Sequence, residues 1–260
     1  MLVADPQLLR EAAEEAGRIA LHHRSQDSLH IVEKPSGQGP VTAADLAIDT
    51  MLRETLLEAR PDYGWLSEET ADTADRLTRE RCFIVDPIDG TRAYIENGRG
   101  FCHALAIAER GQIIAAVAHF PALGRTYWAS AGQGAYRDGA PICVAEPSDE
   151  SPPLLITRAM QSPHHWPSGV PPHVRAYRPS LVARLCYTAE GRFMGSVTFR
   201  PTWEWDVATG SLILTEAGAT VSDGAGGPIA FNQSDPRLDG LIAAAPGYHA
   251  ILLAHRRPAI

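Results

Sequence analysis

The sequence predicts an α+β first half, residues 1–146, followed by an α/β second half, residues 147–260. Two segments with helical spacing of apolar residues open the chain, and a series of short strand-like segments follows them. After a Ser/Pro-rich join at Glu146 to Pro153, strand-like and helix-like segments alternate. A chain of 260 residues is long enough for one large domain or two closely packed halves with a sizeable buried core.

Two helices are predicted at the start of the first half. The first has Asp5 as its N-cap and Pro6 in the first helical position. The second begins at Thr42, where Asp45 three residues later completes a variant of the capping box, and it ends near Pro61. The apolar residues that line one face of these helices are Leu9, Ala13, Ala16, Ile19 and Ala20 in the first and Ile48, Leu52 and Leu56 in the second.

The rest of the first half predicts an antiparallel sheet beneath these helices. The apolar run Cys82 to Val85 precedes a Pro/Gly turn and is typical of a buried strand. Arg110-Gly111 and Asp138-Gly139 are turn dipeptides, and the second is typical of a tight hairpin. The further strands are predicted at residues 103–108, 113–120, 125–129 and 134–137.

In the second half, strands and helices are predicted in alternation. The strands lie at residues 154–157, 193–198 and 240–244, and the helices at about 180–190, at 206–217 and from about 247. A Walker A loop and a G-x-G-x-x-G turn are both absent from the sequence, which excludes nucleotide binding of those two kinds.

Composition excludes several classes of protein. The 23 basic and 31 acidic residues give a formal net charge of −8, which disfavours a partner such as nucleic acid. The sequence contains no apolar run long enough for a membrane span, and the first twenty residues, where a signal peptide would be apolar, include Asp5, Glu11, Glu14 and Glu15. We therefore expect a cytoplasmic protein. The cysteines lack metal or disulfide spacing, so buried reduced thiols are predicted at Cys82, Cys102, Cys143 and Cys186.

The acidic residues are most informative in the segment Asp86–Thr91, which follows the buried strand. Pro and Gly bend this segment so that Asp86 and Asp89 can face one point, with the Ile88 carbonyl between them. Hard oxygen ligands of this kind suit Mg²⁺, and the backbone amides beyond them suit a phosphate. Taken alone, the segment is also compatible with an ordinary Asp/Pro/Gly-rich turn.

Three other acidic elements have a functional and a simpler interpretation. Glu68 and Glu69 follow the apolar pair Trp65-Leu66, and they could point inward or belong to a solvated loop. Asp206 precedes an apolar helix and could be a ligand or only a helix cap. Asp45 has the capping role described above.

Taken in their order along the chain, these four acidic elements resemble the motifs of the inositol monophosphatase superfamily of Mg²⁺-dependent, lithium-sensitive phosphomonoesterases. The matching segments are Val41–Asp45, Ser67–Glu69, Asp86–Thr91 and Trp205–Ala208, and the resemblance covers nearly the whole chain. It implies a layered αβαβα sandwich of the inositol monophosphatase / fructose-1,6-bisphosphatase type. Segments such as Leu66–Thr70 are most similar to CysQ-type 3′(2′),5′-bisphosphate nucleotidases.

The resemblance also implies roles for individual residues. It implies two or three Mg²⁺ ions held by Glu68, Asp86, the Ile88 carbonyl, Asp89 and Asp206, and a water oriented by Glu68 and by Thr91, which Asp45 orients in turn. The substrate contacts it implies are Gly90, Thr91, Asp206, Lys34 and Ser180. Lys34 is the sole lysine among 23 basic residues, so it is either a compact charge facing the metals or an ordinary loop residue.

This sequence departs from the family pattern in places that bear on specificity. Ser67 replaces the first glycine of G-E-E, and Gly39-Pro40 replaces an acid that often precedes V-T. Pro179-Ser180 stands where the family has G-S, and the acid usual after the A-x-G-[RK] segment is missing from residues 190–195.

The activity implied by the resemblance is hydrolysis of a small phosphorylated substrate, foremost the 3′-phosphate of adenosine 3′,5′-bisphosphate. Inositol 1-phosphate and histidinol phosphate are the alternative substrates, and a non-catalytic metal- or sugar-phosphate-binding protein is the remote alternative. A haloacid dehalogenase-type phosphatase is disfavoured because Pro87 occupies the position of its nucleophilic Asp. Family members are monomers or homodimers, and any inner-membrane association would be peripheral.

Overall fold

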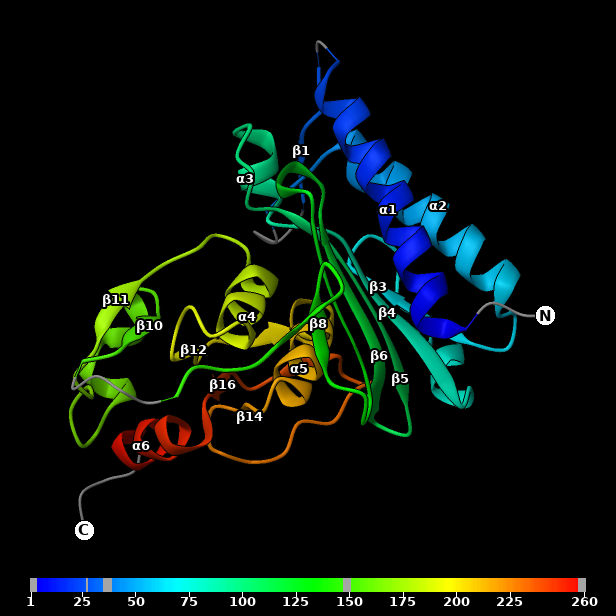
Figure 1. The fold of residues 1–260 in the computed structure, drawn as a ribbon. Coiled ribbons are helices and arrows are strands. Elements are labelled where there is room, and N and C mark those ends of the chain that lie inside the picture. The colour runs from blue at the N-terminus through cyan, green and yellow to red at the C-terminus, as the bar shows by residue number, and fades with distance from the viewer. Residues whose placement is uncertain (1–3, 27, 35–38, 147–150, 257–260) are drawn as a thin grey trace.

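The computed structural model describes residues 4–26, 28–34, 39–146 and 151–256. The elements form five alternating layers, with a helical pair outside a large sheet, a second helical pair inside, then a smaller sheet and a last helix (Figure 1). The layers are α1 (Asp5–Arg24) and α2 (Ala43–Ala59), then seven strands, then α4 (Leu181–Ala189) and α5 (Glu204–Glu216), then five strands, then α6 (Pro246–Arg256). The predicted αβαβα sandwich is confirmed.

The larger sheet contains the strands of the first half. Its order is β3-β4-β5-β6-β7-β8-β9, and all neighbouring strands are antiparallel except β3 and β4, which are parallel. The prediction of an antiparallel sheet is therefore wrong at this edge. The bounds are β3 (Gly64–Ser67), β4 (Arg81–Asp89), β5 (Cys102–Glu109), β6 (Gln112–Phe120), β7 (Arg125–Ser130), β8 (Ala135–Arg137) and β9 (Ala140–Ile142).

The smaller sheet is mixed, as expected for an α/β half. Its order is β11-β10-β12-β16-β14, with β10 parallel to both of its neighbours and β16 antiparallel to both of its own. The bounds are β10 (Pro153–Leu155), β11 (Val174–Ala176), β12 (Gly195–Thr198), β14 (Thr220–Ser222) and β16 (Leu241–Ala244). The minor elements are the pairs β1 (Val32–Glu33) with β2 (Pro40–Val41) and β13 (Thr202–Trp203) with β15 (Arg237–Leu238), the short α3 (Thr91–Ile95), and the 3₁₀ turns Ala74–Thr78, Pro121–Leu123, Ala159–Gln161 and Pro163–His165.

The two N-terminal helices begin in different ways. Ala4 precedes α1 as its N-cap residue, so the prediction of Asp5 as the cap is wrong; Asp5 is in the first turn and its carboxylate pairs with Arg60. The capping box at Thr42 and Asp45 is confirmed, and α2 ends at Ala59, before the proline that follows. The charged first turn of α1 thus ties the two helices together instead of capping one of them.

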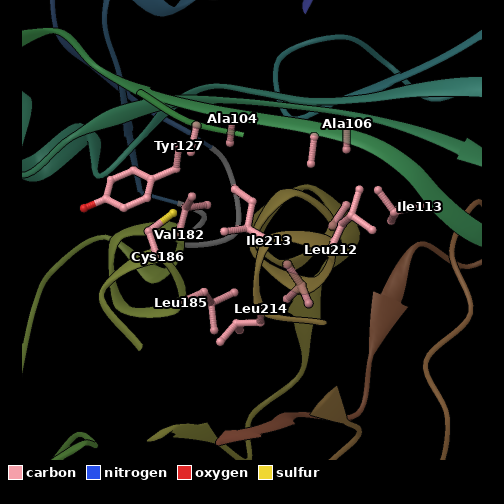
Figure 2. Packing of buried hydrophobic residues seen from close by; sticks show 14 of the residues in the cluster. Ala104, Ala106, Ile113, Tyr127, Val182, Leu185, Cys186, Leu212, Ile213 and Leu214 are labelled. Carbon is pink, nitrogen blue, oxygen red and sulfur yellow. The ribbon is translucent and has the colours of Figure 1, made fainter. Parts of the chain in front are cut away.

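Apolar side chains of α4 and α5 fill the space between the two sheets. Figure 2 shows Val182, Cys186 and Ile213 beneath Ala104 and Tyr127 of the larger sheet, and Leu185 beside Leu214 between the two helices. The cluster contains residues from both predicted halves, so they share a core. The predicted boundary between them adjoins residues 147–150, which lie outside the described residues.

Two further expectations concern burial and membranes. Cys82, Cys102 and Cys186 are buried free thiols as predicted, whereas Cys143 is exposed, so that prediction is wrong for one of the four. Among the residues that the structure describes, no helix has the length and apolar character needed to cross a bilayer.

Candidate active site

The C-terminal end of β4 carries two acidic side chains. Asp86 pairs with Ala104 of β5 and Asp89 pairs with Cys102, with a shift of register between these pairs. Gly90 follows with φ 92°, a left-handed conformation that glycine adopts without strain, and α3 begins at the next residue. The predicted sharp bend is confirmed at Gly90, and the two carboxylates lie within the last four residues of β4.

Asp89 is held by the N-terminus of α4. Its Oδ2 accepts hydrogen bonds from the Ser180 hydroxyl and from the backbone N–H of Val182 at 2.7 Å. Ser180 is fully buried and also caps α4 through the N–H of Ala183. Ser180, expected to contact substrate, thus lies beneath Asp89 instead of on the surface of a cavity, and its contact is with a carboxylate of the site.

Asp86 is buried without a partner for one of its oxygens. Its Oδ1 has no hydrogen bond among the described residues, and the side chain is fully enclosed. Burial first, and then the charges of Glu68 and Asp89, raise the pKa of Asp86 well above its usual range. A buried, ionised carboxylate without a hydrogen-bond partner destabilises the folded state unless a cation neutralises its charge.

Asp206 reaches the same point from α5. It lies in the first turn of the helix, where its Oδ2 accepts the backbone N–H of Trp203 at 3.2 Å. The helix begins at Glu204, two residues before the predicted start. Burial and then the charges of Asp89 and Glu68 raise the pKa of Asp206 to about 8. Its capping contact uses one oxygen only, so the capping and ligand interpretations are compatible.

These three carboxylates form a set suited to a divalent cation. One oxygen from each of Asp86, Asp89 and Asp206 lies within 4.8 Å of the others. Asp86 and Asp89 are buried and Asp206 is half-buried. Like charges this close repel strongly when all are ionised, and the unpartnered Oδ1 of Asp86 is a ready ligand atom. The residues present therefore fit a hard, oxygen-preferring metal ion.

Glu68 lies at the end of β3 beside this set. Because β3 and β4 are parallel, their carboxyl ends meet, and the N–H of Glu68 donates to the carbonyl of Val85 at 3.3 Å. The Glu68 carboxylate accepts a hydrogen bond from Lys34 Nζ at 2.7 Å, and Glu69 accepts one from the same ammonium at 2.7 Å. Lys34 thus lies beside the acidic site, where its ammonium contacts both glutamates.

Burial and these ion pairs change the pKa values of Lys34 and Glu69. Burial opposes the charge of Lys34, but the carboxylates of Glu68 and Glu69 outweigh it, so the pKa of Lys34 is raised. Burial raises the pKa of Glu69 to about 7 despite its bond to Lys34. Among the described residues, Glu68 is the predicted ligand that forms an ion pair with a cationic side chain of this chain.

The hydroxyl of Thr91 lies between two acceptors. It donates to the Ile88 carbonyl at 3.0 Å and lies 3.5 Å from Asp45 Oδ1. The other oxygen of Asp45 accepts from the backbone and hydroxyl of Thr42, and burial raises the pKa of Asp45 to about 6. The expected orientation of Thr91 by Asp45 is thus a weak contact in this state, and the Ile88 carbonyl, a predicted ligand, is the stronger partner.

A cavity of about 730 Å³ opens over Glu68 and Asp206. Its wall carries Trp203 and Trp205, whose rings are stacked with centroids 4.8 Å apart and planes 9° apart. The other residues that line it are Ser67, Thr70, Asp72, Arg200, Pro201, Ser234, Asp235, Pro236 and Arg237.

One supporting residue of this site was not predicted. Asp49 of α2 is buried and accepts the hydroxyls of Ser67 and Thr70, on either side of the two glutamates. The signal was present in the sequence, because Asp49 lies four positions after Asp45 and so shares its helix face. Ser67 therefore gains a hydrogen bond where the family pattern has glycine.

Comparison with known proteins identifies the family. The model of the inositol monophosphatase family matches residues 6–260. The chain belongs to the inositol monophosphatase family. A histidinol-phosphatase of Chlorobaculum parvum is 30% identical over 94% of this chain and 93% of its own. The 3′(2′),5′-bisphosphate nucleotidase CysQ of Salmonella typhimurium is 30% identical over 77% of this chain and 82% of its own.

Other relatives in this family are inositol monophosphatases. The crystal structure of the extragenic suppressor protein suhB of Bartonella henselae superposes with a TM-score of 0.79, covers 98% of both chains and is 24% identical, which establishes the fold. The chain is thus an inositol monophosphatase-family phosphatase, a phosphoric monoester hydrolase that acts on small phosphorylated substrates. Enzymes of this family use divalent metal ions, and the acidic cluster agrees with such use here.

Proposed function

We propose that this phosphatase hydrolyses the 3′-phosphate of adenosine 3′,5′-bisphosphate, using Mg²⁺. The observation that carries the proposal is the stacked Trp203–Trp205 pair, which shares one cavity with Asp206 and with the guanidinium groups of Arg200 and Arg237. An indole face can stack on a purine, and an arginine can bind a second phosphate. In this proposal the base binds in this cavity and an arginine binds the 5′-phosphate, beside the acidic site.

The metal-binding residues in this proposal are Asp86, Asp89 and Asp206, with Glu68 and the Ile88 carbonyl completing the set. Bound Mg²⁺ would supply Lewis acidity, lowering the pKa of water and neutralising charge on the phosphate. Asp86 and Asp89 belong to β4 and Asp206 belongs to α5. Ser180, at the N-terminus of α4, donates a hydrogen bond to Asp89.

Other groups of the chain accept the proton of the water and bind the phosphate oxygens. Glu68 accepts a proton from the attacking water, and the Thr91 hydroxyl orients that water, as the family pattern implies. The backbone N–H groups near Gly90 and Thr91 donate to phosphate oxygens, because they precede the hydrogen-bonded turns of α3. Lys34 forms ion pairs with Glu68 and Glu69 and so offsets part of their negative charge beside the water.

Histidinol phosphate is the second candidate substrate. The observation in its favour is the histidinol-phosphatase of Chlorobaculum parvum, whose similarity extends over 94% of this chain, against 77% for the CysQ relative. Inositol 1-phosphate stands third, on the similarity to inositol monophosphatases.

A panel of substrates tests these alternatives. Phosphate release is measured from adenosine 3′,5′-bisphosphate, histidinol phosphate, inositol 1-phosphate and fructose 1,6-bisphosphate, in wild type and in Trp203→Leu. The proposal expects the highest kcat/KM for the nucleotide and a KM for it that rises in Trp203→Leu. Trp128→Leu is the matched control, because Trp128 stacks on Tyr136, outside the cavity lining. A higher kcat/KM for histidinol phosphate would contradict the proposal and favour the second candidate.

A further inference from the structure

A buried imidazole lies against the backbone of the acidic segment. His103 of β5 is fully buried, and its Nδ1 lies 2.5 Å from the carbonyl oxygen of Pro87. A carbonyl can only accept, so Nδ1 carries the hydrogen and Nε2 is bare. Burial lowers the pKa of His103 to about 3, so the ring is neutral at physiological pH.

The register of the sheet explains why this carbonyl needs a donor. Between the pairs Asp86–Ala104 and Asp89–Cys102, β4 has two residues, Pro87 and Ile88, whereas β5 has only His103. This is a β-bulge, in which the ladder of backbone hydrogen bonds is interrupted. The side chain of His103 takes the place of the missing backbone donor at the position between two proposed metal ligands.

His103 approaches from the face of the sheet opposite to α4 and α5. It shares its face with Phe101 and Leu105, which pack with α1 and α2. Its ring stacks on that of His119, with centroids 6.2 Å apart and planes 25° apart. Gly17 of α1 makes room for this second ring, since a Cβ there would lie 2.8 Å from His119 Nε2. The bulge is thereby supported from the outer helices, and α4 supports Asp89 from the inner side.

We propose that His103 is a positioning residue of the phosphatase site, whose Nδ1–H holds the Pro87 carbonyl and so orients the Asp86 and Asp89 carboxylates for a divalent cation. The Ile88 carbonyl is the next carbonyl along this backbone, and Thr91 holds it at 3.0 Å. The inference rests on the metal-binding role proposed above for the two aspartates. Groups that hydrogen-bond a metal ligand directly typically contribute about 10- to 100-fold to metal affinity, and His103 acts on the residue next to two such ligands.

Two nearly isosteric variants separate this role from simple packing. In His103→Asn the amide nitrogen takes the place of Nδ1, and in His103→Gln it takes the place of Nε2. We expect His103→Asn to bind Mn²⁺ as wild type does, and His103→Gln to bind it about tenfold more weakly. The dissociation constant is measured without substrate, from the electron paramagnetic resonance signal of free Mn²⁺. His103→Val, which has no donor, replaces the Gln variant if that variant does not fold.

Nuclear magnetic resonance tests the same inference on the wild-type protein, so this test does not depend on the folding of a variant. With ¹⁵N-labelled histidine, the Nδ1 resonance of His103 is expected to show a bonded hydrogen and to shift when Mg²⁺ is added. Equal Mn²⁺ affinity in the Asn and Gln variants would overturn the inference while leaving the proposed function intact. A His103 Nδ1 resonance that does not shift when Mg²⁺ is added would do the same. A wild-type protein that binds neither ion would overturn both.

Discussion

Ser180 and Asp89, 91 positions apart in the sequence, share a hydrogen bond in the buried floor of the phosphatase site. The serine hydroxyl has two functions at once, because it donates to the aspartate and accepts the N–H of Ala183 at the start of α4. The second half of the chain therefore holds a carboxylate that the first half supplies.

Ser180→Ala removes both bonds. We expect it to lower the free energy of unfolding by about 1–3 kcal/mol, since a buried carboxylate loses a donor and a helix loses its cap. Turnover is expected to fall as well, because Asp89 is left less firmly oriented. Urea unfolding and steady-state kinetics measure the two effects. Ser196→Ala is the control, since the Ser196 hydroxyl is equally buried and has no hydrogen-bond partner among the described residues. Equal losses in the two variants would contradict the prediction.

Asp206→Asn is expected to lower kcat by orders of magnitude while the chain stays folded. The amide preserves the shape of the side chain but removes the charge that we assign to metal binding. Asp235→Asn is the control for kcat, because Asp235 lines the same cavity outside the acidic cluster and its partner Arg237 is assigned to substrate binding, so this change acts on KM. Kinetics at saturating substrate compare the two. Full activity in Asp206→Asn would refute its assignment as a ligand.

The pH dependence of stability in metal-free protein follows from the pKa of Asp206, which is raised from 3.8 to about 8. The folded state keeps this proton at pH values where the unfolded state has lost it, so the stabilising contribution is full below about pH 4 and is lost as the pH rises to about 8. We expect wild type to lose stability relative to Asp206→Asn over this window, by denaturant unfolding at several pH values. The opposite effect of buried His103, whose pKa is lowered, is present in both proteins and cancels in the comparison. A difference that does not change with pH would contradict the prediction.

Removal of divalent metal should abolish phosphate release and lower thermal stability. A ligand at about one hundred times its dissociation constant stabilises the folded state by about 2.7 kcal/mol. Thermal unfolding with Mg²⁺ and with a chelator measures this difference, and the assay is repeated with lithium and with calcium, which we expect to inhibit. Activity that persists unchanged in excess chelator would rule out the metal mechanism.

Much of the fold could be predicted from local patterns in the sequence. The capping box at Thr42, the sharp bend at Gly90 and the buried run from Cys82 to Val85 are set by neighbours in sequence, and the structure confirms all three. The parallel pairing of β3 with β4 was not predicted, because pairing between strands depends on how distant segments pack. That pairing is also what brings Glu68 beside Val85, and so to the end of the strand that carries Asp86.

The sequence alone specified which residue types the site contains, since acids, a glycine bend and a helix start are marked by short motifs. Three-dimensional packing was needed to assign partners to those residues. Ser180 supports Asp89, Lys34 pairs with Glu68 and Glu69, and His103 binds the carbonyl behind Asp86. The reason is physical: a hydrogen bond forms between groups that lie within about 3 Å, and the chain brings these groups together only after both sheets and the helices between them have packed.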